Sequence, residues 1–363
     1  MLPLFKVNMS PSAKEAVAKV LDSGYIGQGQ KVELFERMLQ QIYGVRPLTT
    51  SGCTHALDLA YHLAHLSPGS KVISTPMTCT ATNSPLLNRY CLIKWADIDP
   101  RTGNIDPRSI ERLLKDEADI EAVVVVDWAG RQVDTKRISE IVTPYHIPVI
   151  EDAAHVFFKH HDKYPPNWYT AYSYGAIKHL TTVTGGSLIA PPEQYERAKL
   201  LRWFGLDRTA NGLCRCSQDI PEAGYSYNMS DVQAAIGIEN AALGIKSVFE
   251  ARNNAHYYEE TFAKLKTVAT PPPDPNSSWW LYVVKTPKRD KFIEYMNASG
   301  IMASPAHRRN DMHSAMPKSV TPLPGVNYYD AHHCAIPVGW WLSEEDRDLI
   351  ARTVVEWDKL VSI

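Results

Sequence analysis

Five short apolar runs, separated from one another by helical patterns, constrain this chain most strongly. A strand that is covered on both faces has such a continuous apolar sequence, and helices between the strands are typical of a mostly parallel sheet. The pattern therefore predicts an α/β domain in which helices cover both faces of the sheet. The runs are KVIST (71–75), CLIKWADI (91–98), AVVVV (122–126), PVIED (148–152) and GSLIA (186–190).

A long amphipathic segment, residues 230 to 265, interrupts this alternation and leads into the proline-rich connector PPPDPNSS, residues 271 to 278. Such connectors are stiff. The sequence after it predicts a strand in WWLYVVK, a helix from Arg289 to Ser299 and a last helix after Ser343. We expect a large α/β domain over residues 1–245 and a smaller α+β domain over residues 246–363.

The composition is that of an ordinary globular protein, with 44% hydrophobic residues, 21% charged residues and a formal net charge of -2. This balance does not indicate a nucleic-acid partner. No segment has the form of a signal peptide, and no apolar run approaches the roughly 20 residues that span a bilayer. We therefore expect a cytoplasmic protein without a membrane partner. The six cysteines lack the paired spacings of a zinc site, so we expect no metal.

The segment TTSGCTHALDLAYHL, residues 49 to 63, places small polar residues, among them Cys53 and Thr54, before a predicted helix. Backbone N–H groups at a helix N-terminus favour a phosphate. Ordinary capping of the helix by Ser or Thr is an equally good interpretation of this segment.

A second segment, PVIEDAAH, ends a predicted buried strand with Asp152. Ligands of open α/β sheets bind at this end of the strands. A carboxylate there can keep a pyridine nitrogen protonated, and His155 could reach a phenolic oxygen of the same cofactor. The alternative is that Asp152 only caps a following helix.

The third segment, YSYGAIKHLTTVTGG, holds Lys178 just before a Thr/Gly loop. A lysine amine in this setting can form a Schiff base with a carbonyl cofactor, of which pyridoxal phosphate (PLP) is the commonest. The hydroxyl of Ser173 could bind the cofactor's phosphate. Most lysines are solvated surface charges, so the interpretation depends on the other segments.

Together these segments resemble the DegT/DnrJ/EryC1/StrS family, which comprises sugar aminotransferases of PLP fold type I. The resemblance extends over nearly the whole chain and includes GYIGQG, RWFGLDR and AGYSYNMSDVQAAIG. It implies that Lys178 forms the Schiff base with PLP and acts as general acid and base. It also implies that Asp152 pairs with the pyridine nitrogen and His155 with the phenolic oxygen. The phosphate ligands implied by the resemblance are Cys53, Thr54 and Ser173.

Two departures from the family pattern concern the cofactor. Cys79, in TPMTCTATN, stands where many relatives have an aromatic ring that stacks on the cofactor. In GYSYN, Ser226 or Asn228 takes the place of an asparagine that in relatives reaches the phosphate of the neighbouring subunit. The resemblance therefore implies a homodimer with shared active sites.

The activity implied by the resemblance is transfer of an amino group from glutamate to a keto group of a nucleotide-linked deoxysugar, for surface polysaccharides or glycosylated metabolites. A dehydratase of the same fold carries histidine in place of the lysine; Lys178 argues against this alternative, and the adjacent His179 keeps it open. A non-catalytic sensor that retains the fold is a third interpretation.

The loop SPAHRRNDMH of the small domain contains His307, Arg308 and Arg309. These side chains could hold the diphosphate of a sugar nucleotide, because guanidinium groups bind phosphate well. A solvated surface loop is the alternative. We expect the tryptophans at positions 279, 280, 340 and 341 to be core or interface residues rather than sugar platforms.

Overall fold

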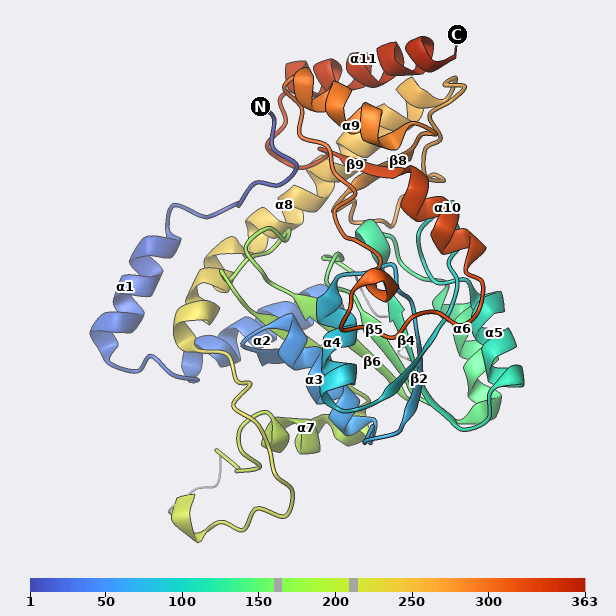
Figure 1. The fold of residues 1–363 in the computed structure, drawn as a ribbon. Helices are drawn as coiled ribbons and strands as arrows, with labels where there is room; N and C mark the ends of the chain where they lie inside the picture. The colour runs from blue at the N-terminus through green and yellow to red at the C-terminus, as the bar shows by residue number, and fades with distance from the viewer. Residues whose placement is uncertain (160–164, 209–214, 363) are drawn as a thin grey trace.

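The computed structural model, which describes residues 1–159, 165–208 and 215–362, is built around a seven-stranded sheet (Figure 1). The strand order is β1-β7-β6-β5-β4-β2-β3. Every pairing from β6 to β3 is parallel, whereas β7 is antiparallel to β1 and β6, so the predicted mostly parallel sheet is confirmed. The strands are β1 (Leu48–Thr50), β2 (Lys71–Ser74), β3 (Leu92–Trp95), β4 (Ile120–Val126), β5 (Val149–Asp152), β6 (Trp168–Ser173) and β7 (Gly186–Ile189).

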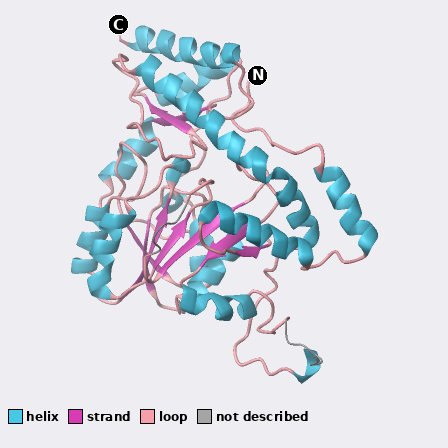
Figure 2. Ribbon diagram, turned by 180° about the vertical axis from the view of Figure 1, so that it is seen from behind, coloured by secondary structure: helices cyan, strands magenta, loops and turns pink. Residues whose placement is uncertain are grey.

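Helices cover both faces of this sheet, as the two opposite views show (Figures 1 and 2). Strand β4 illustrates the reason: Val124 packs in the core cluster that includes α3, and its neighbours Val123 and Val125 pack in the cluster that includes α5 and α6. Successive side chains of a strand point to opposite faces, so an apolar run serves two cores. The helices are α1 (Ala13–Ser23), α2 (Gln30–Tyr43), α3 (Cys53–Leu63), α4 (Thr80–Asn88), α5 (Pro107–Asp116), α6 (Thr135–Val142) and α7 (Tyr195–Leu201).

The longest helix, α8 (Asp231–Phe262), begins with a capping box between Ser230 and Gln233. The carboxylate of Asp231 accepts hydrogen bonds from the backbone of Gly29 at 2.8 Å and of Val32 at 3.0 Å. It thereby joins the N-terminus of α2 to that of α8. A Cβ at Gly29 would lie 2.9 Å from Oδ2 of Asp231, so this close approach requires glycine. The predicted domain boundary after residue 245 falls inside α8, and the division of the chain stays a prediction.

The C-terminal part has a second, smaller core around the antiparallel pair β8 (Tyr282–Lys285) and β9 (His333–Ile336). Three helices complete it: α9 (Arg289–Ala298), α10 (Pro324–His332) and α11 (Glu344–Val361). The chain's first residues also join this part, because Leu2 donates to the carbonyl of Gly300 at 2.6 Å and accepts from Met302 at 2.9 Å. None of the helices in the described ranges is long and apolar enough to cross a membrane.

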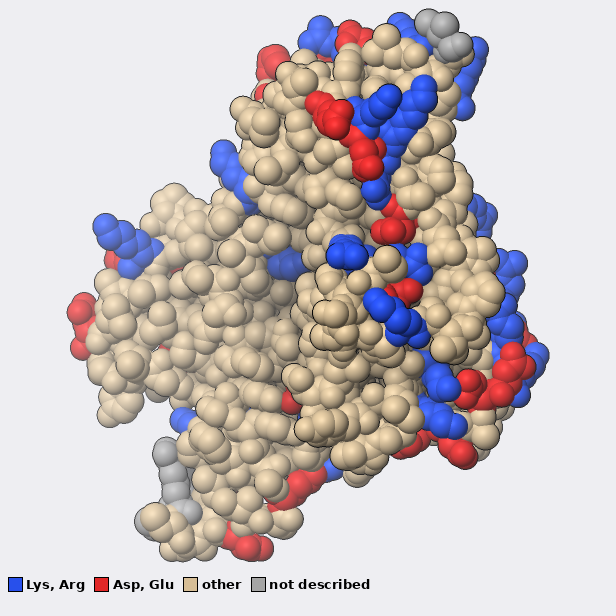
Figure 3. All heavy atoms as spheres, in the orientation of Figure 1, with Lys and Arg blue, Asp and Glu red and all other residues tan. Residues whose placement is uncertain are grey.

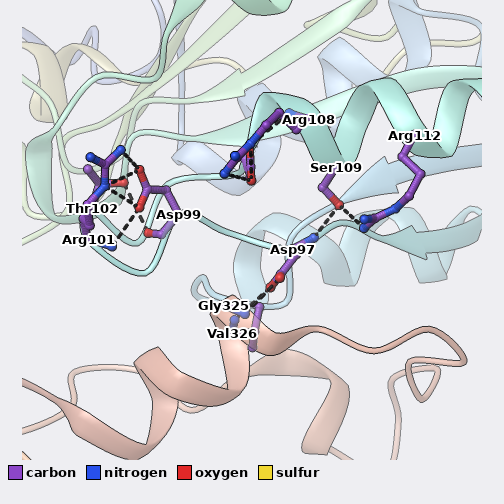
Figure 4. Close-up of polar contacts among 10 residues, drawn as sticks. Asp97, Asp99, Arg101, Thr102, Arg108, Ser109, Arg112, Gly325 and Val326 are labelled. Atoms are coloured by element: carbon purple, nitrogen blue, oxygen red, sulfur yellow. Dashed lines mark hydrogen bonds and ion pairs between the residues drawn. The ribbon is translucent and has the colours of Figure 1, made fainter.

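Asp97 connects the sheet-based part of the chain to the start of α10 (Figure 4). Its buried carboxylate accepts hydrogen bonds from the backbone of Gly325 at 2.9 Å and of Val326 at 2.8 Å. A negative charge at a helix N-terminus is stabilised both by these N–H groups and by the helix dipole. The backbone N–H of Asp97 itself donates to Oγ of Ser109 at 2.9 Å, so the loop is held from both sides.

We predict that Asp97→Ala destabilises the protein by about 1 to 2 kcal/mol, the usual cost of losing a helix N-cap. Asp97→Asn should cost less, because its amide oxygen still accepts a hydrogen bond from the helix. Urea unfolding followed by circular dichroism measures both changes.

The matched control is Asp99→Ala in the same loop, which removes a pair with the exposed guanidinium of Arg101. Surface pairs of this kind contribute about 0 to 1 kcal/mol. A free energy of unfolding that falls no more in Asp97→Ala than in Asp99→Ala would show that Asp97 does not hold α10.

Candidate active site

Several of the predicted site residues meet near the carboxyl edge of the sheet. Asp152 is the last residue of β5, and Ser173 is the last residue of β6. Cys53 is the first residue of α3, and Cys79 directly precedes α4. Lys178 lies in the loop between β6 and β7, and its amine interacts electrostatically with Asp152, Cys53 and Cys79. The structure therefore brings together residues from four separate segments of the sequence.

The Lys178 side chain is half-buried, and its amine lies against an aromatic ring. Burial lowers the pKa of its ammonium group to about 8, although the nearby Asp152 carboxylate partly opposes this change. Nζ of Lys178 lies 3.7 Å from the centroid of the Trp280 ring. A lysine with a depressed pKa has more unprotonated amine near neutral pH, which is the form that attacks a carbonyl carbon.

The Asp152 carboxylate is buried and has two hydrogen-bond donors. Oγ1 of Thr82 donates to Oδ2 at 2.6 Å, and the backbone of Ala154 donates to Oδ1 at 3.0 Å. Burial raises the pKa of Asp152, whereas these two donors and Lys178 lower it. No helix occurs in residues 153–159, which follow the strand, so within this stretch Asp152 caps none.

His155 has one defined tautomer. Its Nδ1 accepts a hydrogen bond from the backbone of Ala129 at 3.2 Å, so the proton lies on Nε2. Burial, with a smaller effect of Lys178, holds the pKa of His155 well below its usual value, and the ring is neutral at neutral pH. The imidazole stacks on Trp280 at a centroid distance of 3.8 Å and an interplanar angle of 19°.

The N-terminus of α3 has no side-chain cap. Gly52 holds the N-cap position in an extended conformation and makes no capping hydrogen bond, while Oγ of Ser51 bonds to Nδ1 of His55 at 2.8 Å. The backbone amides of the first turn are thus not used by a capping Ser or Thr. Gly186 of β7 packs so closely that a Cβ there would lie 2.6 Å from the backbone nitrogen of Cys53. Thr54 is exposed on this turn.

The segment that contains Ser226 and Asn228 runs beside residues 50 and 51, just before α3. Asn228 forms a β-bridge with Thr50, and Ser226 forms one with Trp203. The backbone of Ser51 donates to the carbonyl of Tyr227 at 2.8 Å. Ser226 is exposed and Asn228 is half-buried. Their predicted role toward a second subunit stays a prediction.

The three residues of the predicted substrate loop have different positions. The ring of His307 lies parallel to that of His155 at 6.0 Å, and burial lowers its pKa to about 4. Arg308 is exposed. Nε and Nη2 of Arg309 donate to the two carboxylate oxygens of Asp311, each at 2.7 Å, and Nη1 donates to Oδ1 of Asn327. Only His307 therefore packs in the ring cluster around His155.

Two aromatic residues that the sequence did not assign to the site form part of its wall. Trp280 is buried, as expected, and it contacts both Lys178 and His155. Trp128 meets His155 edge-on at 5.7 Å. Neither tryptophan lies in a sequence motif that points to the site. Only their contacts with distant parts of the chain identify them as site residues.

The residues present fit PLP. A buried carboxylate, Asp152, suits a pyridine nitrogen, and the uncapped turn at Cys53 beside the close-packed Gly186 suits a phosphate. Lys178 supplies the amine that such a cofactor requires. Among the described residues, no cluster of three or more His, Cys, Asp or Glu side chains could hold a metal ion.

Comparisons with known proteins agree with this geometry. The family model of the DegT/DnrJ/EryC1/StrS aminotransferases matches residues 8–355. A UDP-4-amino-4,6-dideoxy-N-acetyl-β-L-altrosamine transaminase of Campylobacter jejuni is 31% identical over 73% of this chain and 70% of its own length. The spore coat polysaccharide biosynthesis protein SpsC of Bacillus subtilis is 26% identical over 94% of this chain and 92% of its own length. The crystal structure of the sugar aminotransferase CalS13 from Micromonospora echinospora superposes with a TM-score of 0.91 and 32% identity, over 98% of this chain and all of that one. These matches confirm the predicted fold type I and the predicted family.

Proposed function

Because the chain belongs to the DegT/DnrJ/EryC1/StrS aminotransferase family, we propose that it holds PLP on Lys178 and moves an amino group from glutamate to a nucleotide-linked keto-deoxysugar. The broader activity, that of a PLP-dependent sugar aminotransferase, is shown by the family and its relatives. The observation that best supports the finer proposal is the buried Lys178 amine, whose pKa burial lowers to about 8, beside the buried Asp152 carboxylate.

When bound, PLP would supply an electron sink for the proton shift between the substrate carbon that bears the amino group and the aldehyde carbon of the cofactor. Lys178 holds the cofactor covalently at rest and then accepts and returns the proton, which a buried amine with a lowered pKa can do near neutral pH. Asp152 holds the proton of the pyridine nitrogen through its charge, and Thr82 and Ala154 orient its carboxylate. His155, with its proton on Nε2, is a donor suited to the phenolic oxygen.

We assign the phosphate to the first turn of α3, with Cys53, Thr54 and the hydroxyl of Ser173 as ligands. The absence of a capping side chain at Gly52 supports this assignment. Burial raises the pKa of the Cys53 thiol well above its ordinary value, so it stays neutral and does not repel a phosphate. Cys79 stands close to Cys53 and Lys178, on the side where the family pattern has a stacking ring.

The substrate class is supported by the relatives. The Campylobacter protein is named for a UDP-linked amino sugar, and the Bacillus protein for polysaccharide synthesis. A nucleotide-linked keto sugar and a surface polysaccharide or glycoside pathway are therefore our proposal for this chain. The cytoplasmic location expected from the sequence stays a prediction.

The dehydratase alternative has one observation in its favour, the presence of His179 next to the lysine. Burial lowers the pKa of His179 to about 4, and its Nε2 has no hydrogen-bond partner in the described parts of the chain. Lys178, not His179, has the contacts with Asp152, Cys53 and Cys79, so the transaminase is the better-supported activity.

The proposed chemistry predicts two half-reactions. Protein loaded with PLP should be yellow, glutamate should bleach the colour, and a keto sugar nucleotide should restore it. Reduction with borohydride followed by peptide mapping should place the pyridoxyl group on Lys178, and Lys178→Ala should lose at least about a hundredfold of the turnover.

Lys159→Ala is not a suitable control, because Lys159 is buried in an ion pair with Glu151. Lys19→Ala serves better, because Lys19 is exposed and pairs with Glu15 on the surface. A pyridoxyl group on any lysine other than Lys178 would contradict the assignment, and a loaded protein that removes a sugar hydroxyl without glutamate would indicate the dehydratase.

We propose that the loop with His307, Arg308 and Arg309 binds the diphosphate of the sugar nucleotide. Arg308 supplies an exposed cation, and Arg309 shapes the loop through its pair with Asp311. A charge-assisted contact contributes about 1.5 to 3 kcal/mol.

Arg308→Ala should therefore weaken the binding of the keto sugar nucleotide about ten- to a hundredfold, with an unchanged glutamate half-reaction. Arg309→Ala should weaken it as well and should also lower the melting temperature, because Asp311 loses its partner while buried. Separate measurement of the two half-reactions tests this. If Arg308→Ala binds the sugar nucleotide like the parent, the loop is a solvated surface segment.

We infer a homodimer with shared active sites, in which Ser226 or Asn228 reaches the phosphate in the neighbouring subunit. Large apolar side chains are exposed: Tyr25 is 84% exposed, and Val183, in the loop that contains Lys178, is 53% exposed. The middle of the face shown in Figure 3 carries few charged side chains, as the cores of protein interfaces do.

A mixture of Lys178→Ala subunits with Ser226→Ala/Asn228→Ala subunits should therefore regain part of the activity that each variant lacks alone. In a mixed dimer one site has the intact lysine and the intact partner segment. Light scattering determines the oligomeric state in the same samples. A fully active monomer at the assay concentration would exclude shared sites.

A further inference from the structure

The side chain of Trp280 lies against both Lys178 and His155, two residues of the proposed active site. It precedes β8, in the C-terminal part of the chain, and its side chain is buried. One indole ring contacts both Lys178, whose Nζ lies 3.7 Å from the ring centroid, and His155, whose imidazole is nearly parallel at 3.8 Å. No other tryptophan in the described residues contacts both groups.

The indole is itself held in a single orientation. Its Nε1 donates to the carbonyl of Ile177, the residue before Lys178, at 3.0 Å. Phe5, from the start of the chain, stacks on it at 4.8 Å and 27°. A ring fixed at its polar edge and by stacking has little freedom, so it can fix its neighbours in turn.

We propose that Trp280 is a positioning residue of this active site: it orients the His155 ring by stacking and holds the Lys178 amine in its charged form over the indole face. The inference rests on the proposed roles of Lys178 and His155. Tryptophan provides the strongest cation–π face among the side chains, and the contact gains strength where water is excluded.

The carboxylate near Lys178 works in the same direction as the indole, because Asp152, at the end of β5, favours the ammonium form. Burial opposes both groups and has the largest effect, so the pKa of Lys178 is lowered to about 8. The indole face therefore acts together with Asp152 against the effect of burial. With a pKa of about 8, a small change in any of the three alters the protonation of the amine near neutral pH.

Three imidazoles lie around Lys178 and are neutral, so they leave this balance unchanged, and the side chain of Lys6 lines the same cavity as Lys178 and Trp280. Burial holds the pKa of His155 well below its ordinary value and lowers those of His307 and His179 to about 4. None of the three imidazoles therefore carries a charge at neutral pH, and above pH 6 they do not titrate together with the lysine. A change in the pKa of Lys178 in this range reports on the indole and the carboxylate.

The test is the pKa of Lys178 in the cofactor-free full chain. The rate at which trace acetic anhydride labels Lys178, followed over pH by peptide mass spectrometry, gives this value without catalysis. Loss of a group that favours the cation lowers a lysine pKa, so Trp280→Leu should lower it by about one unit. Trp280→Phe keeps a weaker aromatic face and should lie between Trp280→Leu and the parent.

Two further variants make the result interpretable. Trp279→Phe changes the adjacent buried tryptophan, which stacks on Tyr282 at 5.3 Å and belongs to the small core, and it should leave the labelling midpoint unchanged. Asp152→Asn removes a charge that favours the cation, so it should lower the midpoint and shows that the method detects such a loss.

If Asp152→Asn lowers the midpoint and Trp280→Leu and Trp280→Phe do not, or if they raise it, Trp280 is a packing residue and the inference is wrong. Trp280→Phe alone decides the question if Trp280→Leu does not fold by circular dichroism. Because the labelling requires no cofactor, this outcome is separate from the proposed function: a failed half-reaction assay would leave the labelling result standing.

Discussion

Burial of the Lys178 amine close to the Asp152 carboxylate is the constraint on which the rest of the site depends. Moving an isolated ion out of water costs several kcal/mol, so each of these groups needs partners. The structure supplies them: Thr82 and Ala154 donate to Asp152, and the Trp280 ring faces Lys178. Burial lowers the pKa of Lys178 and raises that of Asp152, so both groups are closer to exchanging protons near neutral pH than they are in water.

The sheet topology explains why these groups meet. The parallel strands β5 and β6 end side by side, with Asp152 paired to Ala171 near the end of β6. The antiparallel β7 then brings Gly186 back against the start of α3, where only a residue without a Cβ fits. The lysine loop connects β6 to β7 and is therefore confined between the carboxylate and the first turn of α3.

The sequence predicted β2, β3, β4, β5 and β7 from short apolar runs, and each of them except β3, which carries the exposed Leu92, is mostly buried. It missed β1, which has three residues, and β6, whose sequence WYTAYS mixes polar and aromatic residues. It also missed β9, which begins with His333. Lys178, Asp152 and His155 lie in recognisable local segments. Trp280 reaches the site through contacts between distant segments, and the Arg309–Asp311 pair forms within one irregular loop, and no periodicity of the sequence encodes either.

The place of Trp280 in the chain has a consequence for how this enzyme is assembled. Lys178, Asp152 and His155 belong to the sheet-based part, but the indole that faces the amine comes from the part that folds around β8 and β9. Phe5, which stacks on that indole, follows a segment paired with residues 300 to 302. The sheet could thus form with Lys178, Asp152 and His155 in place while the amine of Lys178 still lacked its contact with the indole. The surroundings of Lys178 therefore depend on contact between the two cores, so loosening of the smaller core would change the protonation of the lysine while every strand of the larger core stays in place.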